Sequence, residues 1–327
     1  MRQSRLFSIT ALGLLFSTAC SGGGDSSANP LTPITTMPPS PPTMSAPQSE
    51  TDVVYGTGLT NGGSKTLLLD VYQSGEACST ARPVVVLIHG GGFRTGSKDM
   101  GAFPDIAEQL ADIGYVAISI SYRLEGDDPV PSAEFTPYLD AFISGGGGAS
   151  VPGLVQLANN ISSAVEDAVT AIRWIETNAT DLCVDIDRLG LWGSSAGAVI
   201  AVNAAYGMDD FSIDVRKPAV VIDYWGQLIF DDTIAASDPP LFILHGDEDP
   251  TVRYEQALRL EAEALGVSLP HSFYTVLEAG HGFSAIPIRS VTVDGVSVLD
   301  VTLAFLEAHL LDGTPDYETR SVPLSGG

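Results

Sequence analysis

The chain is poor in basic residues and in cysteine. Its 327 residues include 15 Lys and Arg against 40 Asp and Glu, a formal net charge of −25. Nucleic-acid binding needs basic patches that attract phosphates, and docking on anionic lipid needs clusters of Lys and Arg, so this balance argues against both partners. The 3 cysteines form no CxxC pair and no His/Cys cluster, so we predict no metal site. The acidity itself favours solubility and does not identify a substrate.

The N-terminal apolar run is too short to span a bilayer. It extends from Leu6 to Phe16 and follows Arg2 and Arg5. A positive start followed by a short apolar run is typical of a secretory signal. We therefore expect an exported protein.

A second motif ends this signal. Ser17-Thr18-Ala19-Cys20 resembles a bacterial lipobox, which implies that residues 1–20 are a signal peptide and that Cys20 is lipidated. The only membrane attachment, in the periplasm or at the cell surface, would then be this lipid anchor. Lipoboxes prefer Leu, Val or Ile at the place of Ser17, so cleavage near Ala19 and secretion is an alternative. An unprocessed membrane anchor is a third interpretation.

The composition divides the remaining chain into three parts. Residues 21–50 are rich in Ser, Thr, Pro and Gly. They offer almost no apolar surface to offset the entropy of ordering, so we predict a disordered tether. Residues 51–312 are long enough for one large domain, and 313–327 are expected to be a loosely ordered tail.

Short apolar runs alternate with helical periodicity throughout residues 51–312. The predicted strands are 53–55, 66–72, 84–88, 115–122, 188–192, 219–224, 241–244 and 272–276. The predicted helices are 103–113, 161–177, 198–206, 255–265 and 296–311. This alternation predicts an α/β fold with a mostly parallel sheet and helices on both faces. Residues 124–160 interrupt the pattern, and we expect an irregular insertion that is functional or flexible.

Three glycines follow the most strongly β-branched strand. Residues 84–88 are Val-Val-Val-Leu-Ile, a buried strand of a parallel sheet, and His89-Gly90-Gly91-Gly92-Phe93 comes directly after them. Glycine lets backbone N–H groups approach a ligand closely. This turn is therefore a candidate for binding through its backbone.

Gly193-Ser194-Ser195-Ala196-Gly197 fits the pattern G-x-S-x-G. A predicted strand precedes it and a predicted helix follows it, which is the context of a nucleophile elbow. The glycines permit a tight turn that projects the Ser195 hydroxyl above the sheet. The alternative is a glycine-rich corner between a strand and a helix, without catalytic meaning.

A serine nucleophile needs a base, and the chain has 5 histidines. His281 stands in a glycine-flanked loop after the last strand, at the edge where catalytic residues of open α/β sheets gather, and we predict that it is the base. We expect His89 to brace its turn. The other three histidines are His245 at a strand end, His271 before a strand and His309 near the end of a helix.

The base needs an acid that holds its tautomer. The turn after residues 241–244 is acidic, and we choose Asp249 within it. Asp247 and Glu248 are interpreted as solvated turn residues, and Asp223 is a weaker alternative acid. The order Ser195, Asp249, His281 is the order of the α/β-hydrolase triad.

The glycine turn gains a role once Ser195 attacks a carbonyl, because the oxyanion that forms requires preorganised donors. The N–H of Ala196, the residue after the nucleophile, is one expected donor. Gly91 and Gly92 are the others, so the expected oxyanion hole is Gly91, Gly92 and Ala196.

The combination of motifs resembles the α/β-hydrolase-fold carboxylesterases, near their hormone-sensitive-lipase-like and feruloyl-esterase-like branch. The matching pieces are His89-Gly90-Gly91-Gly92-Phe93, Ser121-Tyr122-Arg123-Leu124, Gly193-Ser194-Ser195-Ala196-Gly197, His245-Gly246-Asp247-Glu248-Asp249 and Gly280-His281-Gly282-Phe283. The resemblance implies an eight-stranded sheet and a serine esterase that needs no cofactor. The family often carries a cap of N-terminal helices that the tether cannot supply, so the insertion at 124–160 is a candidate lid.

The resemblance also bears on the two remaining cysteines. In this fold the strands that begin near residues 84 and 188 lie side by side, and Cys78 and Cys183 precede them by similar short distances. It therefore implies a Cys78–Cys183 disulfide at the sheet end away from catalysis, which suits an exported protein. Two unpaired buried thiols are the alternative.

The expected substrate is a small-molecule or polymeric ester. Aromatic side chains that follow strand ends, or that belong to the insertion, are candidates for the pocket that binds this ester. For each of them, plain core packing is the alternative. The candidates are Phe93, Trp225, Phe283, Phe135 and Tyr138. Two other functions stay open. One is a serine peptidase of the prolyl-oligopeptidase type, and the other is a non-catalytic binding lipoprotein on a hydrolase scaffold.

Overall fold

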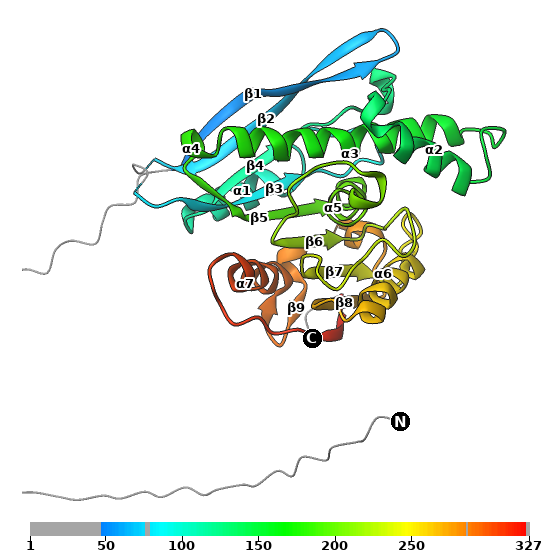
Figure 1. Cartoon of the computed structure of the whole chain (residues 1–327). Helices are drawn as coiled ribbons and strands as arrows, with labels where there is room; N and C mark the ends of the chain where they lie inside the picture. The colour runs from blue at the N-terminus through cyan, green and yellow to red at the C-terminus, as the bar shows by residue number, and fades with distance from the viewer. Residues whose placement is uncertain (1–46, 76–78, 286, 325–327) are drawn as a thin grey trace, which may run out of the picture. The chain divides into compact units, whose positions relative to one another are not determined.

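A nine-stranded sheet forms the centre of the molecule (Figure 1). The computed structural model describes residues 47–75, 79–285 and 287–324. The predicted signal peptide, most of the predicted tether, Cys20 and Cys78 lie outside these ranges. The strands of the sheet are β1 (Pro47–Thr60), β2 (Gly63–Ser74), β3 (Arg82–Ile88), β4 (Val116–Ile120), β5 (Val184–Ser194), β6 (Val220–Tyr224), β7 (Leu241–Gly246), β8 (His271–Leu277) and β11 (Thr319–Pro323).

The sheet is mixed but largely parallel. Its order is β1-β2-β4-β3-β5-β6-β7-β8-β11. β2 pairs antiparallel with both neighbours, β1 and β4, and every later pair is parallel. The carboxyl ends of β3 and β5 to β8 therefore meet at one edge, where loops carry functional groups.

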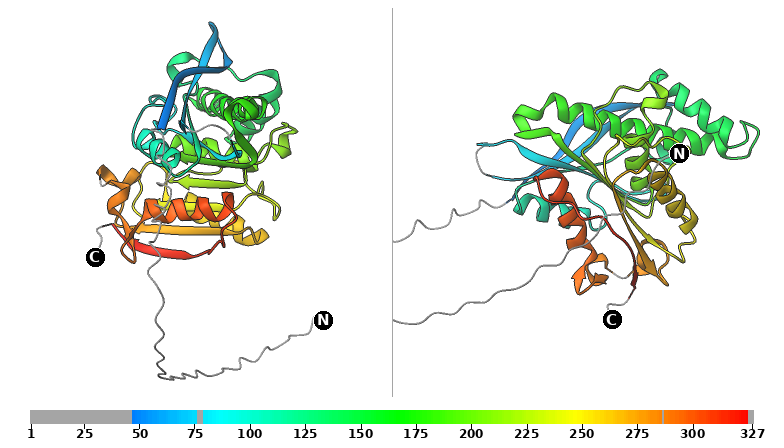
Figure 2. Two further views of the ribbon diagram at one scale, coloured as in Figure 1. Left: turned by 90° about the vertical axis from the view of Figure 1, so that its left-hand side faces the viewer. Right: turned by 60° about the horizontal axis from the view of Figure 1, so that its bottom comes forward.

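Helices cover both faces of the sheet (Figures 1 and 2). The helices are α1 (Phe103–Asp112), α2 (Thr136–Gly145), α3 (Leu154–Thr177), α4 (Ala179–Leu182), α5 (Ala196–Tyr206), α6 (Tyr254–Val267) and α7 (Val298–Leu310). Short 3-10 turns are η1 (Glu125–Asp127), η2 (Ala133–Phe135), η3 (Asp209–Phe211), η4 (His281–Ala285) and η5 (Ile288–Ser290), and a small hairpin is β9 (Thr292–Val293) with β10 (Val296–Ser297). Side chains of α3, α5 and α6 share one core, and those of α1 and α7 share the other.

The central strands serve both cores at once. In β3, Val84, Val86 and Ile88 belong to the core under α3 and α5. Val85 and Leu87 belong to the core under α1 and α7. Successive strand residues point to opposite faces, so a strand that is buried on both sides must be apolar at every position. This explains the continuous aliphatic run in the sequence.

The predicted fold class is confirmed, and all eight predicted strands are present. The sheet gains a ninth strand, β11, from the part of the chain that we expected to be a loosely ordered tail. β11 pairs in parallel with β8, and its Val322 is 4 % exposed. The predicted domain boundary at residue 312 is therefore wrong, because the sheet includes a strand beyond it. At the other end, β1 begins at Pro47, inside the predicted tether.

The insertion at 124–160 is more regular than expected. It contains α2 and the first turns of α3. Its start is anchored by Arg123, whose guanidinium is fully buried and pairs with Asp167 and Glu166 of α3. The same guanidinium donates to the carbonyls of Leu59 and Val130 at 2.9 Å each. Within the described ranges, none of the helices is long and apolar enough to cross a membrane.

Candidate active site

Ser195 occupies a strained turn between β5 and α5. Its backbone has φ 54° and ψ −122°, a conformation that a non-glycine residue adopts only when its surroundings impose it. The two flanking glycines leave no space for a side chain. A Cβ on Gly193 would lie 2.1 Å from the carbonyl oxygen of Gly197, and one on Gly197 would lie 1.9 Å from that of Ile88. The strand, the elbow and the helix therefore require this G-x-S-x-G spacing.

Three side chains form a hydrogen-bonded chain at the carboxyl edge of the sheet. The Ser195 Oγ lies 2.7 Å from the Nε2 of His281. The Nδ1 of His281 lies 2.6 Å from the Oδ2 of Asp249. A carboxylate only accepts, so Nδ1 carries the hydrogen and Nε2 is free to accept from the serine. The structure thus brings together the three residues predicted as the triad.

The Asp249 carboxylate is buried and fixed by its own turn. Its Oδ1 accepts from the backbone N–H groups of Thr251 at 2.8 Å and Val252 at 3.0 Å, which leaves Oδ2 for His281. Asp223, the weaker alternative, instead accepts from the N–H of Gly226 at 2.9 Å. Burial raises the pKa of Asp223 to about 7. The geometry therefore selects Asp249.

Asp247 does more than face solvent. Its Oδ1 accepts from the N–H of Glu278 at 2.7 Å, and its own N–H donates to Val276 at 3.1 Å. These bonds tie the acidic turn to the loop that carries His281. Asp247 is half-buried and Glu248 is exposed, so both lie at the surface as expected, and Asp247 in addition connects two loops.

His89 stabilises the glycine turn from within. Its ring stacks on Tyr122 with centroids 4.3 Å apart, and its Nδ1 lies 2.6 Å from the carbonyl oxygen of Gly90. Burial lowers the pKa of His89, so the ring is neutral and Nδ1 donates. The Tyr122 hydroxyl donates to the carbonyl of His89 at 3.0 Å. These contacts agree with the predicted role as a brace.

The backbone of the glycine turn lies against the nucleophile. A Cβ on Gly90 would lie 3.1 Å from the Cβ of Ser195, so a side chain here would crowd the nucleophile. Gly91 has φ 120° and lines the cavity beside the serine, and Gly92 has φ 61° and is exposed. Ala196 is the first residue of α5, so its N–H has no acceptor within the helix.

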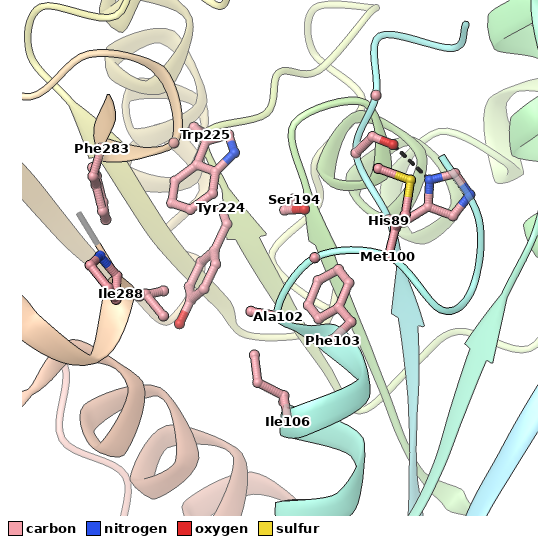
Figure 3. A pocket seen from close by; sticks show the side chains of 15 residues that line it. His89, Met100, Ala102, Phe103, Ile106, Ser194, Tyr224, Trp225, Phe283 and Ile288 are labelled. Carbon is pink, nitrogen blue, oxygen red and sulfur yellow. Dashed lines mark hydrogen bonds between the residues drawn. The ribbon is translucent and has the colours of Figure 1, made fainter. Parts of the chain in front are cut away.

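A cavity of about 650 Å³ opens beside the triad (Figure 3). Ser194, adjacent to the nucleophile, and Gly282, adjacent to His281, contribute to its wall. The larger side chains that line it are Met100, Phe103, Ile106, Tyr224, Trp225, Phe283, Pro287 and Ile288. No Lys, Arg, Asp or Glu occurs among the described residues of this wall. The cavity therefore suits an uncharged, apolar group.

Two of the five aromatic residues predicted for the pocket line this cavity. Trp225 and Phe283 line the cavity and pack on each other with centroids 4.9 Å apart. Phe93 is 7 % exposed and packs toward Tyr122 instead.

The two insertion residues are core residues and do not cover the site. Phe135 and Tyr138 are fully buried. Tyr138 packs against Phe211 and Phe230, with centroids 5.1 and 5.0 Å away. The alternative interpretation, plain core packing, therefore holds for both residues.

The sequence did not predict the parts of the wall formed by α1 and by residues 287–288. Ile106 comes from the first helix after the glycine turn, and Ile288 from the turn η5. The position of 103–106 after a strand end was the available signal, because such segments lie at the carboxyl edge of the sheet. Nothing in the pattern of 287–288 indicated which way that segment would fold.

The described residues contain no group of three or more His, Cys, Asp or Glu side chains placed to hold a metal ion. Cys183 is 5 % exposed, and its Sγ lies 3.5 Å from the carbonyl oxygen of Thr80. Its expected partner, Cys78, lies outside the described ranges, so the disulfide stays a prediction.

Solved structures share this architecture over most of the chain. Thermogutta terrifontis esterase 2 phosphorylated by paraoxon superimposes with a TM-score of 0.59 and 21 % identity, covering 82 % of this chain and 96 % of the other. A carbohydrate esterase from gut microbiota superimposes with a TM-score of 0.55 and 16 % identity, covering 81 % and 96 %. This chain has the α/β-hydrolase fold.

Sequence relatives of this chain include esterases. Residues 69–135 and 154–225 match the BD-FAE family. Esterase LipQ of Mycobacterium tuberculosis is 23 % identical over 73 % of this chain and 58 % of its own length. Carboxylesterase 20 of Arabidopsis thaliana is 29 % identical over 40 % of this chain and 32 % of its own length. The resemblance to carboxylesterases of this fold is thus confirmed, although the chain spans less than two thirds of these curated relatives.

Proposed function

We propose that this α/β hydrolase is a serine esterase that cleaves carboxylic esters through an acyl-enzyme. The observation that carries the proposal is the continuous relay from Ser195 through His281 to Asp249, with distances of 2.7 and 2.6 Å. A base within hydrogen-bond reach of a hydroxyl, and itself oriented by a carboxylate, is the arrangement that activates serine.

The first step forms the acyl-enzyme. The Ser195 Oγ attacks the ester carbonyl carbon while its proton passes to the Nε2 of His281. The N–H groups of Gly91, Gly92 and Ala196 stabilise the oxyanion, and each such donor typically contributes about 3 kcal/mol to the transition state. When the carbon–oxygen bond to the alcohol breaks, His281 returns the proton to the leaving alcohol.

The second step releases the acid. His281 takes a proton from a water molecule, whose oxygen attacks the acyl carbon, and then returns that proton to the Ser195 oxygen as the acyl bond breaks. Throughout, the carboxylate of Asp249 stabilises the positive charge on the ring. The apolar cavity beside Ser194 holds an uncharged part of the ester, such as an alkyl or aryl group.

Replacing Ser195 by alanine tests the proposal. Ser195→Ala should lose nearly all hydrolysis of p-nitrophenyl acetate, on the order of a 10⁶-fold drop in kcat, because the nucleophile is gone. The melting temperature should stay close to that of the wild type. Substantial turnover by this variant would refute the assignment of the nucleophile.

A fluorophosphonate probe distinguishes the alternatives. A non-catalytic binding protein would not be labelled at Ser195, whereas an esterase or a prolyl-oligopeptidase-type peptidase would be. Parallel assays with p-nitrophenyl esters and with prolyl p-nitroanilides then separate the two enzymes. The uncharged, apolar cavity favours esters.

We further propose the covalent features that the sequence suggests. The N–H of Arg82 donates to the carbonyl of Cys183 at 2.9 Å, which supports a Cys78–Cys183 disulfide because it brings the start of β3 beside Cys183. Two reactive thiols in the denatured, unreduced protein would contradict it.

Lipidation of Cys20 in an exported lipoprotein would appear as the mass of a diacylglyceryl group, and its absence would favour simple secretion.

A further inference from the structure

A second histidine lies directly behind the catalytic carboxylate. His245 belongs to β7 and its side chain is completely buried. Its Nε2 lies 2.8 Å from the carbonyl oxygen of Val252. A carbonyl only accepts, so Nε2 carries the hydrogen and the imidazole donates. Burial lowers the pKa of His245, which keeps the ring neutral at physiological pH.

Val252 connects this histidine to Asp249. Its carbonyl accepts from His245, and its N–H donates to the Oδ1 of Asp249 at 3.0 Å. The same Nε2 of His245 also lies 3.5 Å from the Oδ2 of Asp249, which is the oxygen that binds His281. The imidazole therefore holds the turn in the conformation that directs one carboxylate oxygen at the base.

Packing alone does not account for an imidazole at this place. Its Nδ1 is buried and has no hydrogen-bond partner among the described residues. Leaving such a group unsatisfied costs about 1–3 kcal/mol, a cost that an aliphatic side chain would avoid. The Nε2–H on the other side of the ring donates to Val252, and only a polar side chain can supply such a donor.

We propose that His245 is a positioning residue for the Asp249–His281 pair, acting through its hydrogen bond to Val252. The proposal rests on the proposed function, because it assigns a role within that triad. The titratable groups that face the His245 ring are Asp249, His281 and Tyr254, whose ring centroid lies 6.1 Å away. Displacing a reacting group by about 1 Å can cost 10²-fold in rate.

Two amides provide a matched pair of variants. The amide nitrogen of glutamine reaches about as far as the Nε2 of histidine, so His245→Gln keeps a donor for Val252. The amide of asparagine reaches only as far as Nδ1, so His245→Asn loses the donor. The control for a His-to-Asn change as such is His271→Asn. His271 begins β8, and its Nδ1 lies 2.8 Å from the carbonyl oxygen of Leu269, so the asparagine there keeps a donor.

The kinetic readout is the hydrolysis of p-nitrophenyl acetate across pH. His245→Asn should lower kcat by roughly 10- to 100-fold with little change in KM, because positioning of the base fails while the cavity is intact. The acid limb of its pH–rate profile should move to lower pH, since a misaligned carboxylate stabilises the His281 imidazolium less. His245→Gln and His271→Asn should keep the profile of the wild type. Equal kcat and identical profiles for His245→Asn and the wild type would overturn the proposal.

A spectroscopic measurement on the unaltered protein needs no variant to fold and no turnover. The ¹⁵N shifts of the His245 ring should show the neutral tautomer with hydrogen on Nε2. A doubly protonated ring or hydrogen on Nδ1 at neutral pH would overturn the inference. Failure of the proposed function would look different, because the wild type would then neither hydrolyse esters nor be labelled at Ser195.

Discussion

Removing the charge of one buried carboxylate should change how stability depends on pH. Asp223 lies in β6 and is completely buried. Its Oδ1 accepts from Gly226, and its Oδ2 has no partner among the described residues. Burial raises its pKa to about 7. Asp223→Asn keeps the size and the Oδ1 acceptor but cannot ionise.

The sign follows from comparing the folded and unfolded chain. An unfolded Asp has a pKa of about 3.9, so between pH 4 and 7 the folded protein holds a proton that the unfolded chain has released. The free energy of unfolding therefore decreases as pH rises through this window. With a folded-state pKa of about 7, the total decrease is about 4 kcal/mol at 1.36 kcal/mol per pH unit. The asparagine variant lacks this decrease.

Urea unfolding at pH 5 and pH 8 measures the effect. The variant should be more stable than the wild type at pH 8, and its advantage should be about 3 kcal/mol larger there than at pH 5. Asp140→Asn at an exposed site serves as the control, and it should show the same difference from the wild type at both pH values. An advantage of Asp223→Asn that does not grow with pH would refute the reasoning.

Two further substitutions test the cavity and the insertion. Ile106→Trp fills part of the cavity wall and should lower kcat/KM for p-nitrophenyl octanoate at least about tenfold relative to the acetate; an unchanged ratio would show that the cavity does not bind the acyl group. Arg123→Met leaves the buried Asp167 without its cation and should cost about 3–5 kcal/mol in urea unfolding, most of it regained in Arg123→Met/Asp167→Leu; a single variant as stable as the wild type would contradict this.

The parts of the fold that depend on strong burial were predictable from the sequence. Strands such as Val84–Ile88 are apolar at every position because both faces are covered, and that pattern is visible without a structure. β11 was not predictable, because it lies at the sheet edge and only Val322 among its residues is buried. Its pairing depends on β8, and no local signal reveals a partner so distant in the sequence.

The candidate site also has residues that were predictable from the sequence and residues that were not. Residue type and position after a strand identified Ser195, Asp249 and His281, since the chemistry restricts the choice to few side chains. The role of Asp247 and the placement of Phe93 depend on contacts between segments that are remote in sequence. Composition misled us for the insertion, where the aromatic ring of Tyr138 orders a segment rich in Pro and Gly.

The strand that ends just before the catalytic histidine is held on both sides. β7 pairs with one edge of β8, and β11 pairs with the other. The segment 311–317 that leads into β11 is exposed throughout. A protease that cuts there would leave β11 attached to β8 only by non-covalent contacts. Loss of β11 would then expose a free edge on β8, and the alignment of His281 would loosen although every residue of the triad stayed intact. Resistance to proteolysis and catalytic competence would then decline together.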